Sequence, residues 1–145
     1  LEFRRVLFRS VGVDCRILPG DTQDDLEREL RAALGDDVPW EFRFDQGITG
    51  GTESALGTPL HDAIAAAVDA HDPGAVLVPQ LSTGFTDAAF IRQAFGTVAY
   101  GFWPLSVTPL DVYENGMHNK DERIHVDDLG IATAMQIDVV TRLLG

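Results

Sequence analysis

The first part of the chain alternates between strand-like and helix-like patterns of apolar residues. Residues 11–18 alternate, carry β-branched side chains and stop at a Pro-Gly pair, which predicts a strand. Residues 21–34 begin with an Asp-Thr cap and place leucine and alanine at helical spacing, which predicts a helix that Gly35 ends. Residues 38–44 alternate again, with three aromatic side chains on one side, and predict a second strand.

The second part continues the alternation with longer helices. Two short apolar runs, 75–78 and 97–101, are typical of buried strands, and residues 102–117 predict a long loop with two prolines. Helical spacing and caps predict three helices: Pro59 to about Ala70, about Asp87 to Phe95, and Asp127 or Asp128 to Leu144. The inner faces are expected to hold Leu60, Ile64, Ala67 and Val68 in the first of these, and Leu129, Ala132, Ile137, Val140 and Leu144 in the last.

Strands that alternate with helices indicate a fold class and a domain division. Residues 58–145 are expected to form an α/β layer with parallel strand pairs. Residues 11–46 would form a smaller β-α-β unit, although two strands alone make a marginal sheet. The Gly/Thr/Ser-rich residues 47–57 predict a crossover between these two domains.

Composition narrows the class of protein. A hydrophobic fraction of 45% in 145 residues is enough for a core, and no apolar run reaches the roughly 18 residues of a membrane span. No secretory signal pattern is present, and the single cysteine, Cys15, excludes an internal disulfide, so we expect a cytoplasmic protein. The net charge of −12 argues against a nucleic-acid partner, because phosphates would be repelled.

Residues 1–10 differ in character from the rest of the chain. They hold three of the eleven basic residues, and they resemble the in-frame translation of a common sequencing adapter. Without them the net charge would become −14, because three arginines and one glutamate are removed. We therefore expect the natural sequence to start at Val11, inside a longer gene.

The polar segment 116–123 holds the sharpest candidate for chemistry. His118 follows a glycine in a long loop and precedes Glu122 by four positions, an arrangement typical of a metal-binding group. Asp121 and Glu122 are candidates for fixing the loop or for holding the second imidazole nitrogen. A metal site that includes His118 is therefore one prediction, although a solvated loop histidine explains the same residue.

Two upstream motifs complete the candidate site. Residues 84–87 place Gly84, Thr86 and Asp87 before a helix, where free amides and the helix dipole favour a carboxylate, and where Asp87 could equally be an ordinary cap. Arg16 lies in the first strand, and its planar guanidinium could bind both oxygens of a carboxylate or simply pair with a neighbour.

These three motifs, in this order and spacing, resemble the C-terminal end of the M20 family of zinc-dependent peptidases and aminoacylases. The resemblance covers nearly all of residues 11–145 and implies the C-terminal half of a two-zinc exopeptidase-like catalytic domain, with part of a ferredoxin-like α+β lid or dimerisation domain. It implies that His118 ligates one zinc, with cobalt or manganese as possible substitutes. It also implies that Arg16, Gly84 and Thr86 bind the substrate, and that Asp87, Asp121 and Glu122 support the loops. Phe85 departs from the family pattern, which has a second glycine there.

The resemblance implies a metal-dependent amide hydrolase that acts on a small peptide or an N-acyl amino acid and dimerises through its lid. The other metal ligands and the general-base glutamate of such an enzyme precede the lid, and residues 11–145 hold no equivalent. One histidine cannot hold a catalytic zinc, so we expect the chain alone to be inactive, with no catalytic residue of its own.

Two other functions explain part of the same pattern. Ser82, Asp111 and His118 follow the residue order of an α/β serine hydrolase, but Gln80 replaces the first glycine of the nucleophile elbow. Alternatively, residues 11–46 could be a non-catalytic β-α-β dimerisation or binding module. Inhibition by a chelator or by a serine-directed phosphonate would distinguish the two enzymes.

Overall fold

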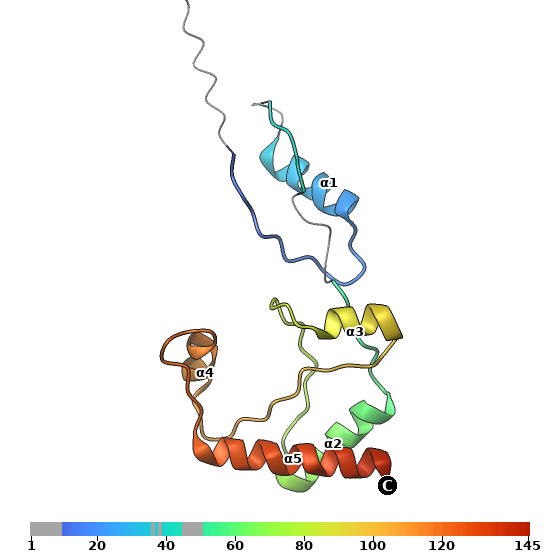
Figure 1. The fold of residues 1–145 in the computed structure, drawn as a ribbon, viewed down its shortest axis with the longest axis vertical. Coiled ribbons are helices and arrows are strands. Elements are labelled where there is room, and N and C mark those ends of the chain that lie inside the picture. Colours follow the sequence, from blue (N-terminus) through green and yellow to red (C-terminus); the bar gives the residue numbers. More distant parts are fainter. Residues whose placement is uncertain (1–9, 36, 38, 45–50) are drawn as a thin grey trace, which may run out of the picture.

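A computed structural model describes residues 10–35, 37, 39–44 and 51–145 (Figure 1). This part of the chain contains helices and irregular segments but no β-strand. The predicted α/β fold with a parallel sheet, and the predicted ferredoxin-like unit, are therefore wrong. Most of the predicted adapter segment, 1–10, and much of the predicted crossover, 47–57, lie outside the described residues.

The five helices follow in chain order along the described segments. They are α1 (Gln23–Leu34), α2 (Pro59–His71), α3 (Ala88–Phe95), α4 (Leu110–Gly116) and α5 (Val126–Leu144). Four of them confirm helices expected from caps and periodicity. The fifth, α4, lies in residues 102–117, which were predicted as loop. None of the described helices is both long and apolar enough to cross a membrane.

Helix α1 is stabilised by hydrogen bonds at its N-terminus rather than by burial in a core. Thr22 accepts a hydrogen bond from the Asp25 amide at 3.3 Å, and Asp25 accepts one from the Thr22 amide at 2.9 Å. This capping box satisfies amide groups that the first turn leaves open. No residue of α1 is buried, because only the extended segment 39–44 lies against it, through Trp40, whose Nε1 donates to the Gly35 carbonyl at 2.9 Å.

The segment 38–44 shows why alternation of apolar and polar residues led to a wrong prediction of a strand. Trp40, Phe42 and Phe44 are half-buried on one side, as the alternation predicted. Trp40 meets Phe42 edge to face at a centroid distance of 5.5 Å, and Phe42 stacks on Phe44 at 5.2 Å. Residues 39–44 are extended, but no second extended segment pairs with them in the described chain. A strand requires backbone pairing with a neighbour, which alternation does not reveal.

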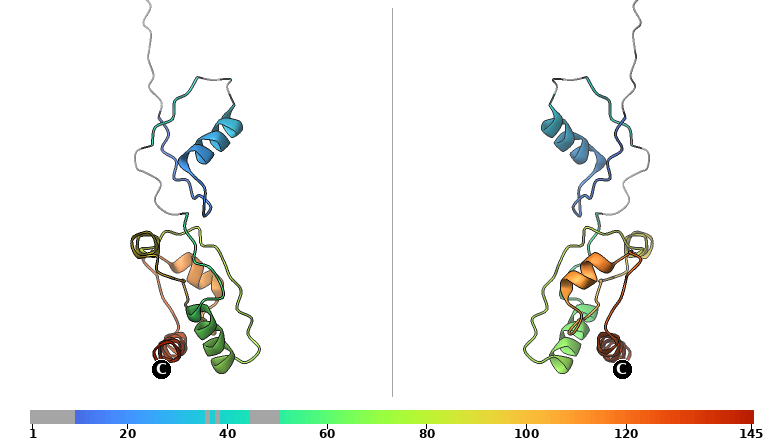
Figure 2. Two further views of the ribbon diagram at one scale, coloured as in Figure 1. Left: turned by 90° about the vertical axis from the view of Figure 1, so that its right-hand side faces the viewer. Right: turned by 90° about the vertical axis from the view of Figure 1, so that its left-hand side faces the viewer.

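The main core lies between α2 and α5, which Figures 1 and 2 show side by side. Its buried apolar residues are small or medium in size, so the core is thin: Ala63, Ile64, Ala67 and Val139. Ala132 and Met135 are also buried on α5. The inner faces predicted for α2 and α5 were not equally accurate. On α2, Ile64 and Ala67 are buried as expected. On α5 only Ala132 of the predicted inner face is buried, and the other four predicted residues are exposed: Leu129, Ile137, Val140 and Leu144.

Extended segments cover this core in place of a sheet. Leu77 and Tyr100, from runs predicted as strands, and Phe102, from the predicted loop, pack against the α2–α5 core. Side chains join these runs to the rest: Ser54 exchanges hydrogen bonds with the backbone of Ala99, and the Arg92 guanidinium donates to the Ala99 carbonyl at 2.7 Å. Backbone pairing is thus replaced by side-chain bonds in the described segments.

This arrangement leaves much apolar surface uncovered in the described chain. Leu34, Phe95 and Leu144, at the ends of three helices, are 62%, 79% and 82% exposed. Val76 and Val78, predicted to lie in a strand buried on both sides, are 81% and 70% exposed. The prediction that the 75–78 run is buried is therefore wrong at Val76 and Val78.

Candidate functional site

His118 lies in a tight turn directly after α4. The Gly116 carbonyl accepts a hydrogen bond from the Asn119 amide at 3.0 Å, Met117 has φ −55° and ψ 129°, and His118 has φ 60°. These values define a type II β-turn with histidine at the third position, where glycine is favoured. Of the described non-glycine residues, His118 alone has a positive φ.

This turn places His118 in a strained conformation. A side chain in the left-handed region brings Cβ close to the following carbonyl and costs roughly 1–2 kcal/mol, although histidine enters the region more often than most residues. The side chain is exposed, so no packing contact requires it there. Backbone strain that packing does not explain is concentrated at functional positions in proteins.

The residues after His118 form a second turn. The Asn119 carbonyl accepts from the Glu122 amide at 3.1 Å, and the Asn119 side chain accepts from the Lys120 amide at 2.8 Å. Asp121 offers its backbone carbonyl to the Arg123 guanidinium at 3.1 Å. Neither the Asp121 nor the Glu122 carboxylate bonds the His118 imidazole among the described residues, so their predicted orienting role stays a prediction.

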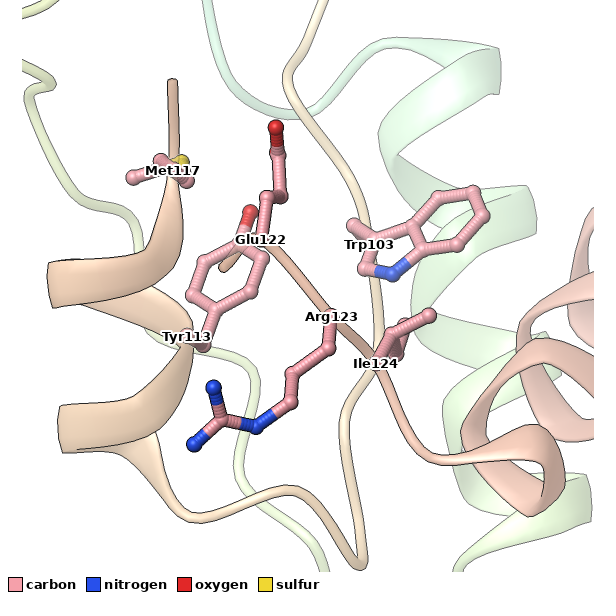
Figure 3. Close-up of a pocket in the computed structure, with 6 residues that line it drawn as sticks. All are labelled: Trp103, Tyr113, Met117, Glu122, Arg123 and Ile124. Atoms are coloured by element: carbon pink, nitrogen blue, oxygen red, sulfur yellow. The ribbon is translucent and has the colours of Figure 1, made fainter. Parts of the chain in front are cut away.

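A hollow of about 410 Å³ lies beside this loop. Figure 3 shows Tyr113 of α4 on one side and Trp103 with Ile124 on the other. Met117, Glu122 and Arg123 complete the lining. The hollow is mainly apolar with two charged groups, a composition common in small-molecule sites.

Asp128, in the first turn of α5, is fully buried and joins this loop to the helix. Its carboxylate accepts hydrogen bonds from the amides of Ser106 at 2.7 Å, Val107 at 2.8 Å and Thr108 at 2.6 Å, and from the Thr108 hydroxyl. Burial alone raises the pKa of Asp128, but these bonds together outweigh burial and hold that pKa well below its usual range.

This carboxylate makes the stability of the fold depend on pH. A carboxyl group with a depressed folded-state pKa stabilises the fold above its unfolded pKa, about 3.9, and loses that contribution as pH falls toward the folded value. The gap in urea midpoint between the wild-type chain and Asp128→Asn should therefore be largest near pH 7 and shrink below about pH 4. A gap of the same size at pH 7 and pH 3 would contradict the ionised, bonded state of Asp128.

His125 has a structural role that the sequence did not suggest. It occupies the N-cap position of α5, where its Nδ1 accepts from the Asp127 amide at 3.2 Å. Its own amide donates to the Thr108 hydroxyl oxygen at 2.9 Å. His125 thus caps α5 and contacts the same threonine that Asp128 binds.

The 84–87 loop is placed before α3, as predicted. The Gly84 amide already donates to the Ser82 hydroxyl at 3.0 Å, so a carboxylate would have to displace that bond. Thr86 is exposed and its carbonyl accepts from Ala89 at 3.2 Å. Asp87 stands at the N-cap of α3 but its side chain makes no capping bond, so the predicted cap bond is absent.

Arg16 pairs with a neighbour. Its guanidinium donates to Asp14 at 2.8 Å, and both side chains are largely exposed. Figure 1 shows the 11–18 segment with α1, away from α4. Within the described chain no hydrogen bond or hollow joins Arg16, Gly84 or Thr86 to His118.

His118 is not gathered with other candidate metal ligands in the part of the chain that the structure describes. The described residues contain no group of three His, Cys, Asp or Glu side chains close enough to bind one ion. A catalytic zinc needs about three protein ligands, so His118 could supply only one of them. The three residues of the serine-hydrolase alternative, Ser82, Asp111 and His118, form no hydrogen bonds with one another in the described chain.

Comparisons of the chain with protein-family models, with curated proteins and with solved structures gave no match. The function must therefore be argued from His118, its turn and the residues that anchor its loop.

Asp128 and Thr108 are the site residues that sequence reasoning missed. One signal could have found Asp128: it stands four, seven and eleven positions before Ala132, Met135 and Val139, the buried residues of α5. An acidic residue at the start of a buried stripe indicates a buried, bonded carboxylate. We instead took Asp128 only as a possible first residue of the last predicted helix.

Proposed function

We propose that this chain belongs to a metal-dependent amide hydrolase of the M20 type and supplies His118 as one metal ligand of its active site. The substrate would be a small peptide or an N-acyl amino acid, and the metal would be zinc, with cobalt or manganese as alternatives. The observation that carries the proposal is the strained, exposed conformation of His118.

The turn supports the proposal because glycine would be the easier residue at this position. Met117, His118 and Asn119 form a turn that fixes the backbone on both sides of the imidazole, while the ring itself has no bonded partner in the described chain. An imidazole that projects from a fixed turn into solvent and has no hydrogen-bond partner leaves a ring nitrogen accessible to a metal.

The chemistry is divided between the metal and the chain. When bound, zinc would acidify a water molecule for attack on the amide carbonyl. The chain would contribute the His118 nitrogen, and Arg16, Gly84 and Thr86 are the candidates for binding the substrate carboxylate. The hollow is lined by Trp103, Tyr113 and Met117, the residue before His118, and it is apolar enough to accept a side chain or acyl group.

We expect a chelator to abolish amide hydrolysis by the full-length protein that contains this chain, because water activation would require the metal. Hydrolysis of N-acetyl amino acids would be measured before and after EDTA treatment and after zinc is restored. A serine-directed phosphonate should have no effect. The chain alone should be inactive in the same assay, since it supplies one ligand. Inhibition by the phosphonate and not by EDTA would favour the serine hydrolase.

A further inference from the structure

We propose that Asp128 is a positioning residue: it joins the two ends of the 109–124 loop, a junction here called the neck, and thereby fixes His118 on the α2–α5 core. The role of Asp128 at the neck stands on the structure alone. Its importance for a metal rests on the proposed function of His118.

The first step of the argument is the geometry of the carboxylate. Both oxygens of Asp128 are occupied: Oδ1 by the Ser106 and Val107 amides, and Oδ2 by the Thr108 amide and hydroxyl. All four donors lie in one three-residue segment on the entry side of the loop. A carboxylate at the N-terminal turn of α5 also interacts favourably with the helix dipole.

Thr108 extends this contact to the exit side of the loop. Its hydroxyl donates to Asp128 and accepts from the His125 amide at 2.9 Å. The chain therefore leaves the core at Thr108 and returns at His125, two residues joined through one oxygen atom. Residues 109–124, which include α4, the His118 turn and much of the hollow's lining, form a loop closed at its base.

The second end of the anchor is the core itself. Asp128 lies on the same face of α5 as the buried Ala132, Met135 and Val139, and Val139 belongs to the core in which α5 packs against α2. The base of the loop is thus attached to α5, which belongs to the best-packed pair of helices in the described chain. A ligand loop that is loose by about 1 Å can lose roughly a hundredfold in rate, so such a fastening would matter at a metal site.

The test compares Asp128→Asn with the matched pair Thr108→Val and Thr108→Ser. Asparagine directs an NH₂ group at donors, and valine removes the shared hydroxyl, whereas serine retains it. Amide hydrogen exchange of this chain should accelerate roughly ten- to hundredfold at 106–108 and across 109–124 in Asp128→Asn and Thr108→Val. It should stay near wild type in Thr108→Ser, and the α2–α5 amides should not change.

A second readout separates positioning from simple stability. In the full-length protein, Thr108→Val should weaken zinc affinity about tenfold, as loss of an outer partner of a ligand does, and Thr108→Ser should restore it. Unchanged exchange in the loop would overturn the neck. Faster exchange with unchanged zinc affinity would overturn the positioning role. If removing His118 leaves zinc binding intact, the proposed function fails, and the exchange experiment still decides whether Asp128 holds the loop.

Discussion

His118→Gly is expected to unfold at a higher urea concentration than His118→Ala, with a difference of about 1 kcal/mol in the free energy of unfolding. Both substitutions remove the imidazole. Only glycine also removes the Cβ that makes φ 60° costly, and it suits the third position of a type II turn. Urea denaturation of the chain, followed by far-ultraviolet circular dichroism, measures the difference.

The comparison also shows whether the strain is tied to function. In the full-length protein both variants should lose metal and amide hydrolysis, although one of them is the more stable protein. His71→Ala is the control, because His71 is a surface residue at the end of α2 and should leave metal content unchanged. An alanine variant at least as stable as the glycine variant would contradict the strained turn.

Ile64→Ala is expected to destabilise the chain by about 2–4 kcal/mol, the largest stability effect of any single truncation in the α2–α5 core. Ile64 is 6% exposed and is the bulkiest aliphatic side chain of α2 in that core. The other buried members near it are mostly alanines, which cannot fill the cavity. A protein with so thin a core has little reserve, so partial unfolding at 25 °C is expected.

The control for this truncation is Ile137→Ala on α5. Ile137 is 62% exposed, so the same chemical change should alter stability by less than about 0.5 kcal/mol. The sequence pattern placed both isoleucines inward, and the pair therefore tests the faces of both helices. Equal losses at the two positions, measured as urea midpoints, would show that the α2–α5 packing described above is incorrect.

The sequence predicted the helices well because their signals are local. Thr22 and Asp25, Pro59, and the glycines after α1 and α3 each act within one turn of the residues they cap or end. It failed on the strands because alternation reports which side of a segment is buried, and not which neighbour pairs with it. Residues 39–44 show the expected burial without pairing, and Val76 and Val78 show neither.

In the candidate site, too, local features could be predicted from the sequence and long-range contacts could not. His118 could be selected from its polar, glycine-led motif, but its left-handed backbone could not, since nothing in the motif reveals a positive φ at histidine. The bonds of Asp128 to residues 106–108 span about twenty positions and depend on how the loop returns to α5. Contacts between residues so far apart leave no local pattern in the sequence. The one indirect signal is that Asp128 has the same helical spacing as the buried residues of α5.

The most direct test of the account is the zinc content of the full-length protein, measured by mass spectrometry of metals for the wild type and for His118→Gly. The account predicts bound zinc in the wild type and the loss of at least one equivalent, together with amide hydrolysis, in the folded variant. A variant that keeps the wild-type zinc content and activity would contradict His118 as a metal ligand.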